Sequence, residues 1–249
     1  MPRDAKPPLI QKIADQAHTT FASADGKARP DAQAELVRLA GEIRASDLRI
    51  AAPKTKSSKP SRHSPPVTYM HICQTDAFSM GVFLLRRGAS IPLHDHPGMD
   101  GILKVLYGKV NIRSFDKLDR PADGECDGLF DPPLAPGAHK DALWRSTLRS
   151  TGEFSEESGP CVLTPLQDNL HQIRAVGGPA AFLDILAPPY DPGDGRDCHY
   201  FRVLEAAARS DEAQAWLLEV PQPESFSCGA EPYPGPEVSV RRGRGTDSR

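Results

Sequence analysis

The chain of 249 residues has no apolar stretch of the roughly 18 residues that a membrane-spanning helix requires. Its first segment, MPRDAKPPLI, also lacks the apolar region of a secretory signal. Basic residues do not outnumber acidic ones, since 30 lysines and arginines stand against 33 aspartates and glutamates. Such a balance does not favour nucleic acid as a partner. We therefore expect a cytoplasmic protein that binds neither a membrane nor a nucleic acid.

Cysteines are few and lack any pairing pattern. The five cysteines are an odd number, and no two of them form a CxxC motif. A disulfide framework uses an even number of cysteines, so we expect reduced thiols. Aromatic residues make up only 6% of the chain, whereas prolines number 25 and glycines 20. That composition is typical of many short strands that are joined by turns.

Four segments follow one another along the chain. Residues 1–51 contain two stretches with apolar residues at helical spacing, and we expect these helices to pack on a barrel. Residues 52–66 are rich in proline, serine and lysine, which predicts a flexible connection. Residues 67–236 contain short apolar or alternating runs between turns, which indicates a single β domain. Residues 237–249 are predicted to be a basic, disordered tail.

Two histidines, His94 and His96, are separated by one residue just before an apolar run. On a strand, residues two apart project from the same face with their Cα atoms roughly 6–7 Å apart, so one ion can accept both rings. Gly88 lies six positions before His94, and Gly108 follows the apolar run. This frame resembles the first motif of the cupins. It predicts a mainly β fold, a cupin (double-stranded β-helix, jelly-roll) barrel with an N-terminal helical segment.

The acidic ligand of the usual cupin motif is missing. Four residues separate His96 from Gly101, which stands where the carboxylate is expected, and Asp100 lies one position out of register. A second cupin-like motif begins at Gly159 and ends at His171, with one extra residue before the histidine. The candidate ligands are therefore three imidazoles and no carboxylate. Imidazole binds iron, copper, zinc and nickel alike, so the ligand type leaves the ion open.

Three neutral ligands do not offset the positive charge of a divalent ion, as a carboxylate would in part. Such an ion favours an anionic ligand such as a thiolate, and it keeps positions open beside it. Oxygenation of a thiol at iron needs that arrangement. The inference is not forced, because zinc held by three histidines in carbonic anhydrase activates water instead.

Long and unusual stretches of residues 67–236 resemble the thiol dioxygenase family that comprises the cysteamine dioxygenases and the plant cysteine oxidases. These stretches are IPLHDHPGMDGILKVLYG, LHQIRA, FLDILAPPYDPGDGRDCHYFRVLE and WLLEVPQPESFSCGAEPYPGP. The resemblance implies a non-haem enzyme with one Fe(2+) per chain, held by His94, His96 and His171. It implies that O2 converts a thiol into a sulfinic acid.

The same resemblance implies two substrates. Cysteamine would yield hypotaurine, and the N-terminal cysteine of proteins would yield cysteine sulfinic acid, which feeds the oxygen-dependent N-degron pathway. The sequence leaves the choice between them open. We expect the enzyme to act as a monomer.

Four further residues are candidates for the site. Asp184 interrupts the apolar run FLDIL, and a buried acid costs free energy unless it has a partner. One interpretation is a carboxylate that orients either the substrate amine or a ligand histidine. The alternative is an acid on the solvent-exposed face of a strand.

By resemblance, Tyr190 in APPYD lines the mouth of the pocket; the alternative is an ordinary turn residue. Cys198 and Tyr200 would share one face of a strand, and a thioether cross-link has been proposed for this pair in similar enzymes. The alternative is an ordinary buried pair.

The other histidines are not expected to bind metal. His199 would face away from Cys198 and Tyr200 on a strand. Surface or packing positions are expected for His18, His63, His71 and His139.

Two rival functions remain open. A cupin of other chemistry, such as a zinc or nickel isomerase or hydrolase, predicts activity without oxygen consumption. A non-enzymatic cupin binding module predicts no turnover and tolerance of a His171→Ala substitution. The missing carboxylate favours a thiol oxygenase over other cupin oxygenases, and the segment GRDCHYFRVLE disfavours the binding module.

Overall fold

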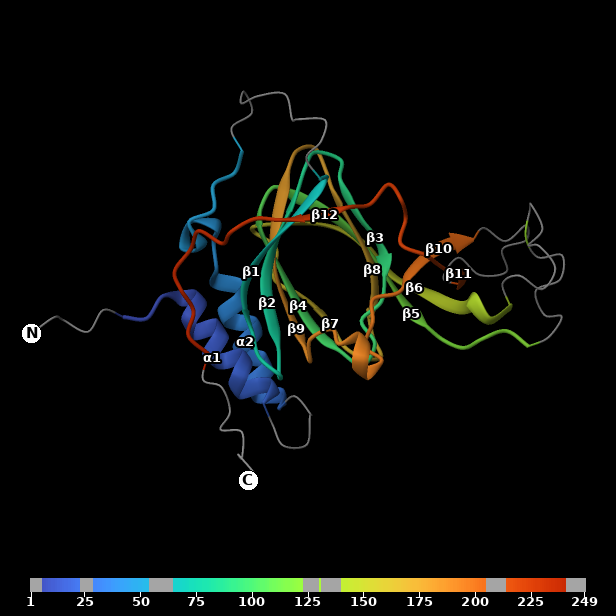
Figure 1. Ribbon diagram of the computed structural model, residues 1–249, viewed down its shortest axis with the longest axis horizontal. Coiled ribbons are helices and arrows are strands. Elements are labelled where there is room, and N and C mark those ends of the chain that lie inside the picture. The colour runs from blue at the N-terminus through green and yellow to red at the C-terminus, as the bar shows by residue number, and fades with distance from the viewer. Residues whose placement is uncertain are drawn as a thin grey trace, which may run out of the picture.

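A computed structural model shows two helices against one side of a β barrel (Figure 1). It describes residues 6–22, 29–53, 65–122, 130, 140–204 and 214–240. No helix in these ranges is long and apolar enough to cross a membrane. The predicted fold class, a mainly β barrel of the double-stranded β-helix type behind an N-terminal helical segment, is confirmed.

The strands form two sheets. In the first sheet the order is β12 (Cys228–Ala230), β1 (Val67–Gln74), β2 (Ser79–Leu85), β9 (Ala180–Ala187), β4 (Asp100–Tyr107) and β7 (Cys161–Leu163). The second closes on itself in the order β10 (Tyr200–Leu204), β11 (Gln214–Val220), β6 (Leu143–Ser155), β5 (Lys109–Lys117), β8 (Leu170–Ala175) and β3 (Ser90–His94). Short 3-10 turns span Ala45–Leu48, Lys140–Ala142 and Pro192–Asp194.

The helices cover the outer face of the first sheet. Helix α1 (Leu9–Phe21) and helix α2 (Pro30–Glu42) each bury an apolar stripe, and α2 begins with a proline, whose fixed φ suits a first helical turn. Their buried side chains join one cluster with side chains of β2, β4 and β9, such as Val82, Ile102 and Leu183. The inner face of the same strands contributes to a second cluster, which includes Leu103 and Phe182. Strands with both faces buried explain the near-continuous apolar runs in this part of the sequence.

Gly108 is required by the turn between β4 and β5. Its φ is +74°, a left-handed value that side chains other than glycine rarely adopt. A Cβ at this position would also lie 2.3 Å from the carbonyl oxygen of Pro179. The last glycine of the first cupin motif therefore has a structural role in the turn.

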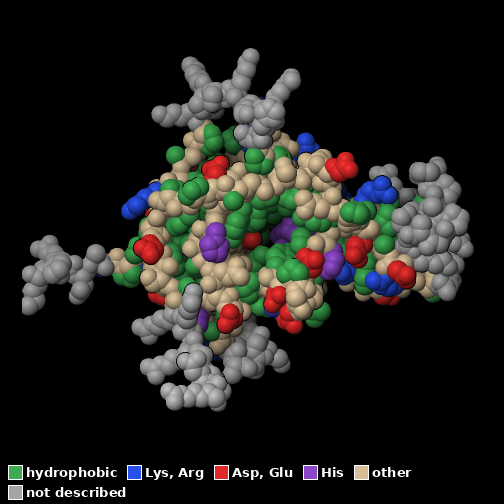
Figure 2. All heavy atoms as spheres, viewed as in Figure 1, with side chains coloured by type: hydrophobic (Ala, Val, Ile, Leu, Met, Phe, Trp, Pro, Cys, Tyr) green, Lys and Arg blue, Asp and Glu red, His purple; other side chains and the backbone are tan. Residues whose placement is uncertain are grey.

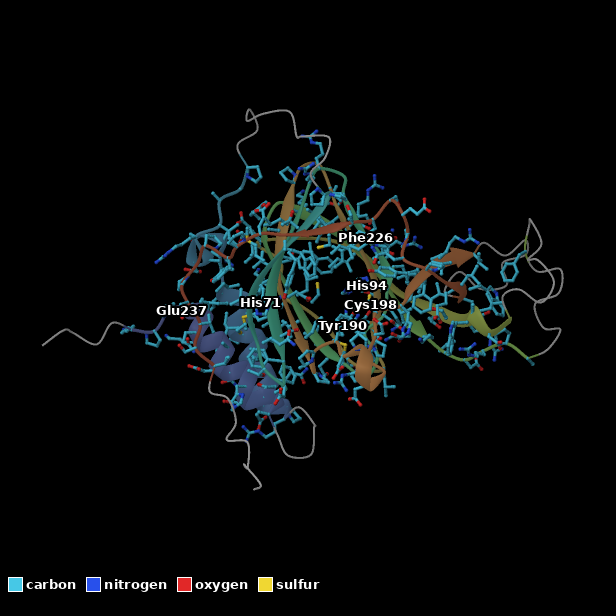
Figure 3. All side chains as sticks on the ribbon, in the orientation of Figure 1. His71, His94, Tyr190, Cys198, Phe226 and Glu237 are labelled. Atoms are coloured by element: carbon cyan, nitrogen blue, oxygen red, sulfur yellow. The ribbon has the colours of Figure 1, made fainter. Side chains whose placement is uncertain are left out.

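The segment 237–240, which the sequence assigns to the tail, lies along α1. Val238 and Val240 pack against the helix-side cluster. The backbone of Ser239 exchanges two hydrogen bonds with the Gln11 side chain, at 2.8 and 2.9 Å. Glu237 is labelled beside the helices in Figure 3. Packing therefore continues past residue 236, and residues 241–249 lie outside the described part of the chain.

Other expectations also fall on residues that the structure leaves undescribed. The predicted flexible connection at 52–66 includes residues 54–64, which lie outside the described ranges, as do His63, Cys126 and His139. The cysteines within those ranges are free thiols, namely Cys73, Cys161, Cys198 and Cys228.

Candidate metal centre

Three buried histidines converge inside the second sheet. His94 ends β3, His96 follows two residues later, and His171 lies on β8 directly opposite His94 in the antiparallel ladder. One ring nitrogen from each residue lies within 4.8 Å of the other two. The ring centroids are 4.7–4.8 Å apart in every pair. The chain thus brings together the three side chains that the two motifs single out.

The rings of His94 and His96 do not converge by simple strand alternation. Strand β3 ends at His94, and its register against β8 shifts between Ile91 and His94. His96 is held in the following segment by Asn169, whose side chain accepts the His96 backbone N–H at 3.0 Å and donates to the His96 carbonyl at 2.8 Å. The two motifs do not identify Asn169, because nothing in the segment LQDNLH marks its amide as buried.

Two backbone carbonyls determine which ring nitrogens face the centre. Nδ1 of His94 lies 2.8 Å from the carbonyl oxygen of Pro92, and Nδ1 of His96 lies 2.7 Å from that of Asn169. A carbonyl oxygen can only accept, so each Nδ1 carries the proton. Each Nε2 is therefore left with a free lone pair, as a metal ligand requires.

The histidine cluster is neutral near pH 7. Burial and the neighbouring His94 ring lower the pKa of His96 to about 3, and burial also lowers the pKa of His94. The pKa of His171 lies well below its usual range, first because of burial and then because of the two other rings. Three neutral imidazoles with converging nitrogens form a donor set that fits a divalent transition-metal ion.

No carboxylate completes the cluster, and packing explains why position 101 is glycine. A Cβ on Gly101 would lie 2.8 Å from the side chain of Leu163 on the neighbouring strand β7. An acidic residue there would displace Leu163. Asp100 is half-buried, with its pKa raised by that burial, and is not part of the histidine group.

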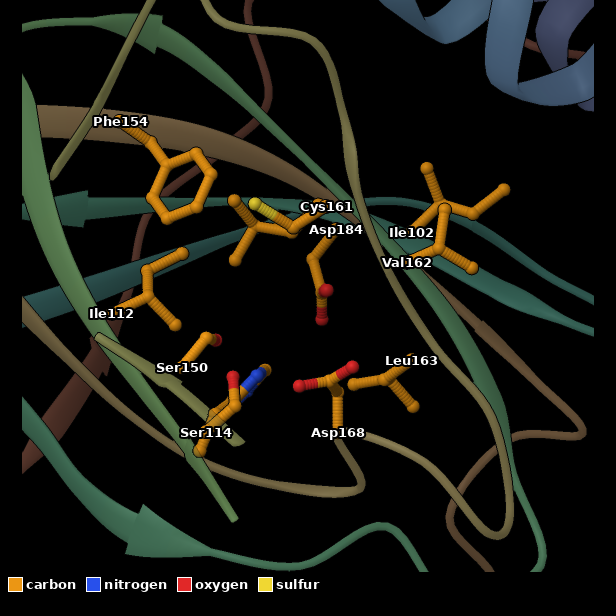
Figure 4. A pocket seen from close by; sticks show the side chains of 12 residues that line it. Ile102, Ile112, Ser114, Ser150, Phe154, Cys161, Val162, Leu163, Asp168 and Asp184 are labelled. Atoms are coloured by element: carbon orange, nitrogen blue, oxygen red, sulfur yellow. The ribbon is translucent and has the colours of Figure 1, made fainter. Parts of the chain in front are cut away.

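Asp184 faces the interior of the barrel. It lines a cavity of about 180 Å³ together with His171, Asp168 and Cys161 (Figure 4). Its neighbours along β9, Leu183 and Ile185, point to the helix side instead. Among the described residues, none donates a hydrogen bond to its carboxylate, and burial raises its pKa to about 7. The carboxylate is therefore a free acceptor in the wall of the cavity next to a candidate ligand.

Tyr190, Cys198 and Tyr200 lie beside the histidines. The Tyr190 ring centroid is 5.8 Å from that of His96, and the Tyr200 centroid is 6.4 Å from that of His94. The Cys198 thiol contacts both phenols, and its pKa is raised to about 11, chiefly by burial. Burial likewise raises the pKa of Tyr200 to about 12. Strand β10 begins at Tyr200, so Cys198 precedes the strand, and a shared strand face does not explain their contact.

The cluster is reached from one end of the barrel. Figure 2 shows a hollow at this end, with a histidine side chain visible inside it. Figure 3 labels His94, Tyr190, Cys198 and Phe226 around the same opening, with His71 across from them. His71 is exposed and does not join the metal cluster, and His18 lies on α1.

Comparisons with known proteins find one family and several close relatives. The family PCO_ADO matches residues 39–238. The 2-aminoethanethiol dioxygenase of Homo sapiens is 51% identical over 96% of this chain and 99% of its own length. The mouse (Mus musculus) protein of the same name is 52% identical over the same shares. Plant cysteine oxidase 1 of Arabidopsis thaliana is 32% identical over 74% of this chain and 58% of its own length.

Solved structures resemble the chain more distantly. KdgF from Halomonas sp. is 12% identical with a TM-score of 0.35, covering 57% of this chain and 97% of that one. A cupin superfamily protein from Desulfitobacterium hafniense is 14% identical with a TM-score of 0.33, covering 55% and 94%.

Proposed function

The chain belongs to the PCO_ADO family, and on that premise we propose that it is a non-haem iron dioxygenase that converts cysteamine to hypotaurine. One observation carries the proposal: a site of three neutral imidazoles without a carboxylate, in a chain 51% identical to a 2-aminoethanethiol dioxygenase over nearly its whole length. One iron ion per chain is part of the proposal. The monomeric state and the cytoplasmic location stay predictions.

His94, His96 and His171 would hold the iron through their Nε2 atoms. For His94 and His96 this assignment is supported by the carbonyls that occupy Nδ1. Iron, when bound, supplies open coordination positions for a thiolate and dioxygen and the redox chemistry that couples them. The protein keeps the ligand set neutral, so the positive charge of the metal remains available to an anionic sulfur.

Asp184 would orient the substrate by its amine. An ammonium group in the cavity beside His171 would meet the Asp184 carboxylate, to which no described residue donates a hydrogen bond. A carboxyl group with a pKa of about 7 is only partly ionised when the site is empty. The approach of a cation would favour its ionised form, so amine binding and loss of the carboxyl proton reinforce each other.

Tyr190, Cys198 and Tyr200 would form the polar wall of the site on the opposite side. The Tyr190 hydroxyl donates to the backbone carbonyl of Asp95 at 2.7 Å, and the Cys198 thiol lies against the same phenol. The contact between Cys198 and Tyr200 is compatible with a thioether cross-link between them. A loss of two hydrogens from the peptide that contains both residues would demonstrate the cross-link.

The N-terminal cysteine of proteins is a second candidate substrate. It presents the same amine and thiol as cysteamine, and a histidine side chain is visible inside the hollow at the end of the barrel (Figure 2). The similarity to Plant cysteine oxidase 1 favours a cysteine-based substrate as well.

The decisive experiment is anaerobic reconstitution with Fe(II), followed by oxygen uptake and product mass. With cysteamine, we expect a product heavier by two oxygen atoms and one O2 consumed per product. A peptide that begins with cysteine tests the second substrate under the same conditions. Activity that requires zinc or nickel and consumes no oxygen would replace the proposal with another metal chemistry. Absence of turnover with every metal would favour a binding module.

A further inference from the structure

Asp95 lies between two candidate ligands, yet its side chain points away from the histidine cluster. The carboxylate is 2% exposed. Its Oδ1 accepts the backbone N–H of His199 at 2.9 Å and lies 3.1 Å from the ring Nδ1 of the same residue. The backbone N–H of Asp95 donates in return to the His199 carbonyl at 3.1 Å. Asp95 and His199 are therefore joined through both backbone and side chain.

A lysine supplies the opposite charge. Lys117 on β5 donates from Nζ to Oδ2 of Asp95 at 3.1 Å. The same ammonium lies over the rings of Trp144 and Phe201, at 4.4 and 5.2 Å from their centroids. Both carboxylate oxygens of Asp95 are thus occupied, which is the condition under which a buried charge is tolerated.

These bonds restrain the residues that form the polar wall. His199 is the chain neighbour of Cys198 and Tyr200, so a restraint on His199 restricts both. Tyr200 pairs with His94 in the ladder between β10 and β3. Tyr190, from a different segment, donates to the Asp95 carbonyl. One residue of the metal-binding segment is therefore bonded to Tyr190 and to His199, which lies between Cys198 and Tyr200 in the chain.

We propose that Asp95 is a positioning residue: its carboxylate holds residues 198–200 against the histidine cluster, and its backbone carbonyl holds Tyr190 there. Its side chain is not one of the three candidate ligands and does not line the cavity beside His171. Its consequence for catalysis rests on the proposed function: the Cys198 thiol and the Tyr200 phenol line the site only while the segment 198–200 stays in place. Its structural consequence does not depend on that function.

Hydrogen exchange of the full-length, zinc-loaded protein tests the structural consequence. In Asp95→Ala, we expect amide exchange in residues 198–200 to accelerate by about tenfold, because the acceptor of the His199 N–H is lost. Exchange in β9 should stay unchanged. His199→Leu keeps the backbone bonds and removes only the ring contact, so a smaller acceleration at the same residues is expected. This variant also keeps the test available if Asp95→Ala does not fold.

Asp116→Ala is the matched control. Asp116 precedes Lys117 on β5, but its carboxylate bonds to the Asp168 N–H at 2.6 Å and to Arg149 at 3.1 Å. We expect no acceleration at residues 198–200 in this variant. Equal exchange in wild type and Asp95→Ala, or an equal acceleration in β9, would overturn the role of Asp95.

Activity provides the separate readout. Iron-loaded Asp95→Ala should oxidise cysteamine with a kcat about tenfold lower at unchanged iron content. An unchanged kcat would overturn the catalytic consequence. A wild type that does not oxidise any thiol would refute the proposed function, and the exchange data would still decide whether Asp95 positions the segment.

Discussion

The two faces of strand β9 belong to different regions of the molecule. On the outer face, Leu183 and Ile185 are each 1% exposed and pack in the cluster that the helices cover. On the inner face, Asp184 projects into the cavity beside His171. Alternation along a single strand thus separates a region that stabilises the fold from a region that is suited to chemistry.

The two regions also differ in the interactions that their buried side chains make. The helix-side region needs only apolar surface and close packing. The histidine region buries imidazoles, an amide and carboxylates, and three of these side chains have defined partners: Pro92 for His94, Asn169 for His96, and His199 with Lys117 for Asp95. Mutations in the first region should therefore reduce stability, whereas mutations in the second should reduce metal binding or activity.

The largest effect is expected from His171→Ala in the histidine region. Removing one of three ligands should abolish stoichiometric iron binding and reduce thiol oxidation by more than about a hundredfold. Iron content and oxygen uptake measure both. His18→Ala on α1 serves as the histidine control and should retain both properties. Full iron content in His171→Ala would refute the ligand assignment.

Leu183→Ala tests the helix-covered region. The cavity left under the helices should lower the free energy of unfolding by about 2–5 kcal/mol, measured by denaturant titration. Iron content should be unchanged at temperatures where the variant is folded. Leu166→Ala provides the matched control, because Leu166 is 85% exposed and its truncation should alter stability by less than about 0.5 kcal/mol. Loss of iron from folded Leu183→Ala would show that the two regions are not independent.

Asp184→Asn changes the inner face of the same strand with little change in volume. The kcat/KM for cysteamine should fall by about 10- to 100-fold, because an amide cannot pair with an ammonium as a carboxylate does. A thiol without an amine, such as 2-mercaptoethanol, should be oxidised equally by both proteins. An equal fall for both thiols would instead indicate a role for Asp184 toward the metal site.

The smallest effect concerns the pH dependence of stability. The pKa of Asp184 is raised to about 7 in the folded state by burial, whereas an unfolded aspartate titrates near 3.9. Between these values the folded state binds a proton that the unfolded state releases, so the contribution of Asp184 to stability is lost as the pH rises through 7. Between pH 5 and pH 7, the free energy of unfolding of the wild type should therefore fall by about 2 kcal/mol or less relative to that of Asp184→Asn. Denaturant titration at each pH measures this difference. Parallel stability curves for the two proteins would contradict the raised pKa.

Much of the helix-covered region is predictable from local patterns. The apolar spacing in residues 1–51 predicts helices, and α1 and α2 are found there. Alternation around Asp184 predicts that it faces away from Leu183 and Ile185, but alternation does not reveal which face of β9 is covered by helices. A local pattern also does not predict how far toward the C-terminus the packed chain continues, since the contact of Ser239 with Gln11 joins residues 228 positions apart.

The sequence by itself determined the chemistry of the candidate ligands: the spacing of His94 and His96, the third imidazole at His171, and a glycine where a carboxylate is usual. Only the tertiary structure decided how these groups are held. The proton on Nδ1 of His96 depends on a carbonyl 73 residues away, and Asp95 reaches His199 across 104 residues. Bonds between residues so far apart depend on strand register and burial, which are set when the sheets close around the core.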